Sequence, residues 1–203
     1  MHISEGVLSA PVLVSGAALA AAGTAVGLKK LDYDQIANVG MLSAAFFVAA
    51  LIHVPVGPAS VHLVFNGIVG TLLGWAAFPA ILVALILQAM LFQFGGITTL
   101  GANTVIMALP AVACYYLFGW FISRWPASTL LAGFISGFLA VLLSALLLGM
   151  ALVFTGESFS VIAKLVVLAN APVMFIEGIV TAFCIGFLKK VRPEILPFSG
   201  LSK

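Results

Sequence analysis

The first two residues, Met1 and His2, form a set of nitrogen donors that could chelate a metal ion. The α-amino group of Met1, the backbone nitrogen of His2 and Nδ1 of the His2 ring can close fused chelate rings around one ion. A planar nitrogen set is typical of Ni(II) or Cu(II) rather than of tetrahedral zinc. Histidine is not a small second residue, so we expect Met1 to be retained. The alternative is that His2 lies on a frayed terminus and binds nothing.

His62 is the candidate for the fourth nitrogen donor. It ends a Pro- and Gly-rich stretch, residues 55–62, which predicts irregular backbone. Such backbone is tolerated at membrane depth where it is buried in protein or lines a cavity. For His53 we favour a role that fixes a ligand's ring over direct ligation.

Other polar residues could orient the N-terminal loop rather than bind the ion. The candidates are Asn66, Thr98, Thr99 and Asn103. The alternative for all four is ordinary hydrogen bonding of loops and helix caps. Glu177 lies in the middle of an apolar run, and we expect it to face the bundle interior and not the metal.

Composition predicts an integral membrane protein. The 203 residues are 64% hydrophobic and 7% charged, with a mean hydropathy of +1.29, which lies outside globular usage. The formal charge of +2 is spread over short loops, so nucleic-acid binding is not indicated. Cys114 and Cys184 lie in apolar runs without metal-ligand spacing. No basic segment precedes the first apolar run, so we expect it to be kept as a helix and not cleaved as a signal peptide.

Apolar runs of spanning length predict an all-α integral membrane protein, a bundle of about seven transmembrane helices. The predicted spans are residues 8–28, 36–53, 61–77, 79–94, 104–122, 127–154 and 161–188. No internal repeat or linker interrupts them, so residues 1–203 are expected to form a single domain.

The basic residues predict the orientation of this bundle. Seven spans with the N-terminus outside and the C-terminus cytoplasmic collect the cations on the cytoplasmic side, as the positive-inside rule requires. They are Lys29, Lys30, Arg124, Lys189, Lys190, Arg192 and Lys203, which leaves Lys164 on the outer side. All three histidines are then at the outer face of a multi-pass protein.

Three separate segments resemble the motifs of one protein family, and they follow one another along the chain in the order found in that family. They are Met1–Leu8, His53–His62 and Gln88–Asn103, and they are similar to the CbiM/NikM family, the substrate-binding S components of energy-coupling factor transporters for cobalt and nickel. The resemblance implies a six-helix S-component core plus an extra N-terminal helix in a prokaryotic cell membrane. It also implies a Met-His loop tucked into the bundle that binds the ion with a further histidine, which corresponds to His62.

Two departures from the cobalt branch favour nickel. Gln93 and Phe94 precede Gly95-Gly96 where that branch usually has a histidine, and Leu-Val-Phe-Asn follows His62 in place of a Pro-Thr-Gly pattern. The leading hypothesis is therefore a subunit that captures Ni(II) as transported substrate, without a cofactor. The alternative is a cobalt S component in cobalamin synthesis.

The chain has no Walker A sequence, so ATP hydrolysis must come from another polypeptide. The resemblance implies a transmembrane coupling subunit, two ATPase subunits and often a small accessory membrane protein as partners.

Two other classes are weighed against this hypothesis. An intramembrane enzyme would need a base and an oriented nucleophile, and Ser60 beside His62 has no third orienting group. A vitamin-binding S component is disfavoured because few charged or aromatic groups accompany the three histidines near the outer loops. We therefore predict no catalytic residues.

Overall fold

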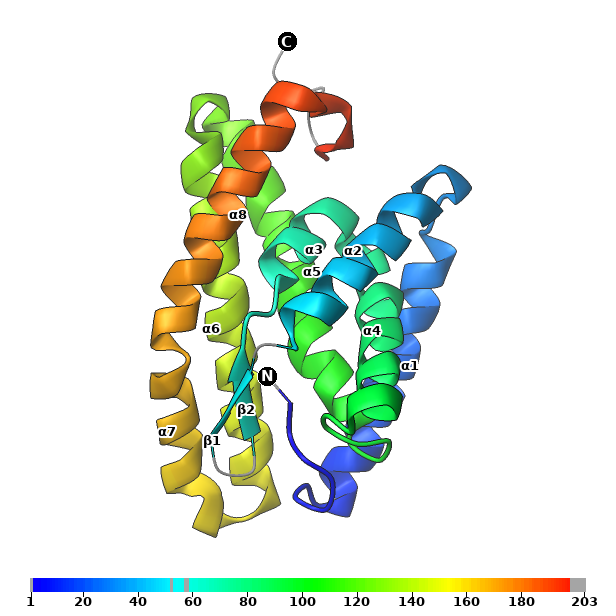
Figure 1. Ribbon diagram of the computed structural model, residues 1–203, viewed down its shortest axis with the longest axis vertical. Helices are drawn as coiled ribbons and strands as arrows, with labels where there is room; N and C mark the ends of the chain where they lie inside the picture. The colour runs from blue at the N-terminus through cyan, green and yellow to red at the C-terminus, as the bar shows by residue number, and fades with distance from the viewer. Residues whose placement is uncertain (1, 52, 57–58, 198–203) are drawn as a thin grey trace.

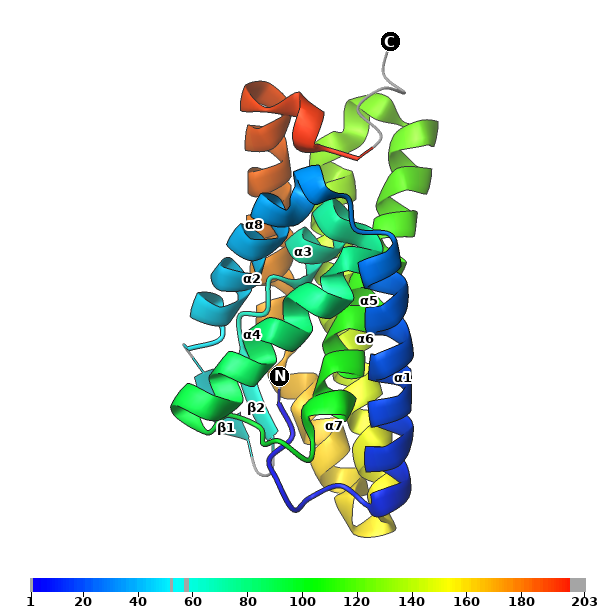
Figure 2. The same cartoon turned by 90° about the vertical axis from the view of Figure 1, so that its right-hand side faces the viewer.

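The computed structural model describes residues 2–51, 53–56 and 59–197 and is a bundle of helices (Figures 1 and 2). The α-helices are α1 Ala10–Lys29, α2 Ile36–Ala49, α3 Asn66–Leu73, α4 Ala77–Phe92, α5 Leu100–Arg124, α6 Thr129–Thr155, α7 Ser160–Ala169 and α8 Ala171–Val191. Single 3-10 turns lie at residues 33–35, 74–76, 126–128, 157–159 and 193–195.

A short β-hairpin, which the sequence did not predict, lies between α2 and α3 of the helical bundle. Strands β1 (His53–Val56) and β2 (Ala59–His62) are antiparallel, with His53 opposite His62. The prediction that the third span begins at residue 61 was wrong, because the chain stays extended through His62 and α3 begins at Asn66. The prolines and glycine of this segment disfavour helix.

The predicted last span consists of two helices. α7 ends at Ala169 and α8 begins at Ala171. Pro172 stands at the start of α8, where its missing N–H and fixed φ are tolerated, whereas inside a continuous helix they would break the hydrogen-bond ladder.

Five segments of the described chain are long and apolar enough to cross a membrane. They are Ala10–Lys29, Asn66–Phe92, Leu100–Arg124, Pro126–Thr155 and Glu157–Val191. The segment Asn66–Phe92 covers the predicted third and fourth spans, and α2 has only 14 residues, fewer than the about 20 that a span needs. The multi-pass character is confirmed, whereas the count of seven stays a prediction.

Helix α5 is the centre of the bundle. It packs against α1, α3, α4 and α6, while α8 lies along α6. Gly70 allows α3 to approach α5, because a Cβ at this position would lie 2.2 Å from the carbonyl oxygen of Ala111. Close backbone approach at small residues is the expected mode of packing inside a bilayer.

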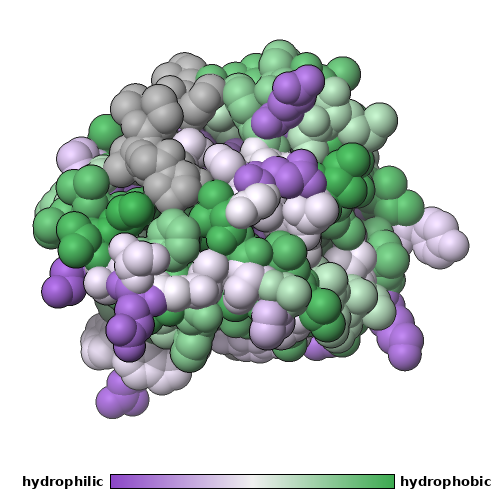
Figure 3. Space-filling model, turned by 90° about the horizontal axis from the view of Figure 1, so that it is seen from below, coloured by the Kyte–Doolittle hydropathy of each residue, from purple (hydrophilic) through white to green (hydrophobic). Residues whose placement is uncertain are grey.

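The two ends of the bundle differ in character. We call the lower end in Figure 1 the histidine end, because the N-terminal segment, the hairpin and the loop after α4 lie there. Seen from below, hydrophilic and near-neutral residues lie in patches among apolar ones on this face (Figure 3). At the other end, the basic end, lie Lys29, Lys30, Arg124, Lys189, Lys190 and Arg192. Lys164 of α7 lies toward the histidine end.

Replacement of Gly70 by alanine should destabilise the bundle, because the new Cβ would force α3 and α5 apart. Overpacking of this kind costs about 1–3 kcal/mol, so thermal unfolding in detergent should shift to lower temperature. Gly40→Ala is the matched control, because a Cβ at Gly40 meets nothing within 4 Å, and its melting temperature should be unchanged or higher. Equal melting temperatures for the two variants would contradict this account of α3–α5 packing.

Candidate metal site

The N-terminal segment runs into the bundle and is tied there by its backbone. The N–H of Ile3 donates to Asn103 Oδ1 at 2.9 Å, and Asn103 Nδ2 donates back to the Ile3 carbonyl at 3.1 Å. The N–H of Ser60 donates to the His2 carbonyl at 3.1 Å. The segment is therefore held by α5 on one side and by the hairpin on the other, and Ile3 is fully buried.

The loop between α4 and α5 closes over this segment and needs glycine to do so. Gly96 has φ +149°, and a Cβ there would lie 2.6 Å from Glu5 Oε2. Glu5 donates its N–H to the Gly95 carbonyl at 2.9 Å and accepts the Thr98 N–H at 3.3 Å through Oε1. Only a residue without a side chain lets the loop approach Glu5 this closely.

Two buried imidazole rings meet at the inner end of the segment. His62 Nε2 lies 3.0 Å from His2 Nδ1, and the rings are stacked with their centroids 4.6 Å apart and their planes at 28°. His2 is 4% exposed and His62 is 2% exposed. The structure thus brings together the two histidines that the sequence places 60 positions apart.

Neighbouring acceptors determine which nitrogen of each ring carries a hydrogen. The carbonyl oxygen of Leu63 lies 2.7 Å from His62 Nδ1 and can only accept, so His62 Nδ1 donates. Gln88 Oε1 lies 2.7 Å from His2 Nε2, and Gln88 Nε2 donates to the Phe47 carbonyl at 3.3 Å, which fixes the amide orientation. His2 Nε2 therefore donates as well.

In neutral rings, this assignment leaves lone pairs on the two nitrogens that face each other. His2 Nδ1 and His62 Nε2 are both acceptors, and a 3.0 Å approach of two acceptors is favourable only if a cation lies between or beside them. Burial lowers the pKa of His62 to about 4, so this ring is neutral at pH 7. The pair is chemically suited to bind a metal ion.

The other predicted site residues lie as follows. Asn103 orients the N-terminal segment, as described above. Thr98 contributes its backbone N–H to Glu5, and its side chain is exposed. Asn66 donates instead to the Ala140 carbonyl and to Ser144 Oγ, so it fastens α3 to α6. Met1 and the side chain of His53 lie outside the described residues.

Sequence reasoning missed the role of Gln88. It is a fully buried amide in the last two turns of the apolar α4, and it fixes the tautomer of His2. A polar residue at that depth is costly and usually functional, so its position was a signal that could have been used. The contact of Glu5 with Gly96 had no such signal, because it joins two loops distant in sequence.

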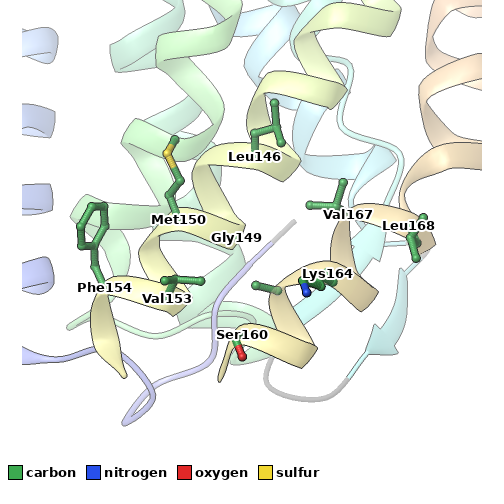
Figure 4. Close-up of a pocket in the computed structure, with 10 residues that line it drawn as sticks. Leu146, Gly149, Met150, Val153, Phe154, Ser160, Lys164, Val167 and Leu168 are labelled. Atoms are coloured by element: carbon green, nitrogen blue, oxygen red, sulfur yellow. The ribbon is translucent and has the colours of Figure 1, made fainter. Parts of the chain in front are cut away.

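No group of three or more His, Cys, Asp or Glu residues that could hold a metal exists within residues 2–51, 53–56 and 59–197. Further donors to an ion at the two histidines could come from the backbone, from the chain terminus, from water or from residues outside this part. The large groove of about 660 Å³ between α6 and α7 is of another kind (Figure 4). Its walls are apolar apart from Ser160 and Lys164, and side chains such as Met150 and Phe154 continue onto the exposed flank, as expected of a surface that meets lipid.

The spanning helices define a multi-pass membrane protein, and two buried histidines face each other at one end of it. The chain belongs to the CbiM family, described as the cobalt uptake substrate-specific transmembrane region, whose model matches residues 2–195. It is therefore a substrate-specific membrane component for cobalt or nickel uptake, and the family points to a transporter rather than an enzyme.

Individual relatives support this assignment over nearly the whole chain. A Haemophilus influenzae protein named for metal transport is 43% identical over 97% of both chains. A cobalt transport protein CbiM of Sorangium cellulosum is 31% identical over 97% of this chain and 94% of its own. The crystal structure of a transition metal transporter superposes with a TM-score of 0.79 at 26% identity, covering 96% of this chain and 94% of that one.

Replacement of Asn103 by alanine should release the N-terminal segment, because both hydrogen bonds to Ile3 are lost. Hydrogen–deuterium exchange of a peptide covering residues 2–8 should become faster, while α5 keeps its protection. Thr104→Val is the control, since the Thr104 hydroxyl donates only within α5, to the Leu100 carbonyl. Unchanged exchange in Asn103→Ala would mean that other contacts hold the segment.

Proposed function

We propose that this protein captures Ni(II) at the outer face of the cell membrane as the substrate of ATP-driven uptake. The observation that carries the proposal is the pair of acceptor nitrogens, His2 Nδ1 and His62 Nε2, 3.0 Å apart in a buried site. Two nitrogens with lone pairs and no carboxylate among the described neighbours suit a late transition metal better than Mg²⁺ or Ca²⁺.

The distance between these nitrogens fits two neighbouring ligands of one ion. With metal–nitrogen bonds of roughly 2 Å, donors at adjacent corners of a square lie ~2.8 Å apart, against the 3.0 Å between the histidines. Only a small movement would therefore be needed on binding. Outer hydrogen bonds from the rings to Leu63 and Gln88 already orient both ligands, as is usual for metal-bound histidines.

The remaining two donors in the proposed site are the α-amino group of Met1 and the backbone nitrogen of His2. Both belong to the same chelate as His2 Nδ1, so one segment supplies three nitrogens and His62 supplies the fourth. Four nitrogens in one plane produce a strong field, which favours d⁸ Ni(II) or Cu(II) over Zn(II). A nickel complex of this kind should be diamagnetic and yellow.

Cobalt is the second candidate substrate, since the matching family model is described by cobalt uptake. Relatives named for nickel also match, among them a fused nickel transport protein NikMN of Rhodobacter capsulatus, 40% identical over 56% of this chain and 35% of its own. We favour nickel because the loop before Gly95 has Gln93 and Phe94 and no histidine that could complete the higher coordination of cobalt.

The proposed orientation has the histidine end outside and the basic end in the cytoplasm. Six of the described cations lie at the basic end (Figure 1), as the positive-inside rule requires. The proposed partners are a transmembrane coupling subunit, two ATPase subunits and a small accessory membrane protein. The absence of a Walker A sequence and the fusion of related chains under the name NikMN support such an assembly.

Replacement of either histidine should abolish tight nickel binding. His2→Ala and His62→Ala each remove a proposed ligand, whereas His53→Ala should weaken binding less. Equilibrium titration with Ni(II), in competition with Co(II), Cu(II) and Zn(II), would measure the effect on the purified protein and rank the substrates. Wild-type nickel affinity in His62→Ala would exclude His62 as the fourth donor.

Extension of the chain by one residue ahead of Met1 should end the dependence of nickel binding on His62. The extension converts the Met1 amine into an amide and moves the histidine to the third position, where the new amine, two amide nitrogens and the ring could fill all four corners of a square and leave no place for His62. The variant should still insert and unfold at the wild-type temperature. One residue added after Lys203 is the control and should change nothing. Nickel binding in the extended protein that is still lost on His62→Ala would mean that the Met1 amine is not a ligand.

A further inference from the structure

A buried carboxyl group on α8 contacts the backbone that immediately follows His62. Glu177 is fully buried, and its Oε1 accepts the N–H of Val64 at 2.5 Å and that of Phe65 at 2.7 Å. Glu177 and Val64, which this hydrogen bond joins, lie 113 positions apart in the sequence. These two hydrogen bonds are not needed by helix α8, whose own backbone is paired, so another reason for a costly buried acid must exist.

We propose that Glu177 is a positioning residue for His62 and thereby connects the metal site to helix α8. This inference rests on the proposed function, in which His62 Nε2 binds the ion. In this role, one oxygen atom of Glu177 holds the segment 63–65, and the His62 ring then presents Nε2 to His2.

Hydrogen bonds connect Glu177 to the His62 ring through the backbone of residues 63–65. His62 Nδ1 donates to the Leu63 carbonyl, and the next two residues donate their N–H groups to Glu177. The carbonyl that orients the ring and the first N–H that Glu177 accepts belong to the same peptide unit, Leu63–Val64. Because a peptide unit is planar and rigid, fixing its N–H also fixes the direction of its carbonyl. Glu177 thus acts on the ring through one rigid group.

The backbone at Phe65 gives a second reason for this anchor. Phe65 has φ +55° and ψ +14°, a left-handed conformation that a bulky residue rarely adopts. It turns the chain from β2 into α3, which begins at Asn66. A sparsely populated conformation persists only where surrounding contacts determine it, and the hydrogen bond from the Phe65 N–H to Glu177 is such a contact.

The backbone of α8 at Glu177 lies where three helices meet. A Cβ at Gly137 of α6 would lie 2.5 Å from the Glu177 carbonyl oxygen, and a Cβ at Gly67 of α3 would lie 2.6 Å from Gly137. A displacement of the segment 63–65 on metal binding would therefore be transmitted to a tightly packed contact of α3, α6 and α8. Such packed contacts shift as units and do not deform continuously.

The test is a series of substitutions at Glu177, with nickel as the probe on the full-length purified protein. Glu177→Gln keeps an acceptor oxygen at the same reach without charge and should bind nickel within about threefold of wild type. Glu177→Asp keeps the charge but withdraws the oxygen by one methylene, and Glu177→Met removes the acceptor. These two should weaken nickel binding by about 10- to 100-fold, the usual effect of losing an outer hydrogen bond to a metal ligand.

A spectroscopic readout separates positioning from general destabilisation. Glu177→Asp and Glu177→Met should shift the visible absorption band of bound nickel, because the His62 ring is turned, whereas Glu177→Gln should retain the wild-type band. Thr181→Val is the matched control, one turn further along α8 and also fully buried, and it should change neither affinity nor spectrum. If Glu177→Met does not fold, the comparison of Asp with Gln still decides the question.

The possible failures have different signatures. If His62→Ala binds nickel like wild type, the proposed function is wrong at its fourth ligand. If His62 is required but Glu177→Asp binds with wild-type affinity and spectrum, the positioning role is wrong. Weak binding by Glu177→Gln together with wild-type binding by Glu177→Asp would show that charge matters and the acceptor position does not, which also overturns the inference.

Discussion

Two imidazole nitrogens, His2 Nδ1 and His62 Nε2, lie 3.0 Å apart inside this protein. Surrounding hydrogen bonds from several residues of the histidine end hold the two rings in this arrangement. Leu63 and Gln88 fix the tautomers, while Asn103 fixes the backbone of the N-terminal segment. Both rings are therefore oriented by the protein's own hydrogen bonds, which reduces the ordering cost of binding an ion.

The hydrogen bonds that organise the site come from separate parts of the helix bundle. Gln88 lies on α4, Asn103 on α5 and Glu177 on α8. The ligands themselves lie on extended segments, the N-terminal segment and strand β2. This division matters because extended backbone inside a membrane protein needs partners for its polar groups. The hairpin pairs β2 with β1, the N-terminal segment pairs with Asn103 and Ser60, and Glu177 satisfies the turn into α3.

The sequence was sufficient to predict the membrane class, and it singled out His2, His62 and Asn103, which the structure brings together at the N-terminal segment. Hydropathy identified the long helices because their apolar runs are continuous. It could not show that residues 59–62 form a strand or that α7 and α8 are separate helices, since periodicity does not distinguish these within apolar runs. The contacts of Gln88 and Glu177 depend on tertiary geometry, which joins residues 86 and 113 positions apart. Their burial in apolar helices indicated a role but not a partner.

The central claim is that four nitrogens from two short segments bind nickel in one plane, and nickel K-edge X-ray absorption of the loaded protein tests it most directly. The account predicts one shell of four nitrogen neighbours, with outer-shell scattering from two imidazole rings and the pre-edge feature of a square-planar ion. A spectrum with six nitrogen or oxygen neighbours, or with scattering from a single imidazole, would contradict it.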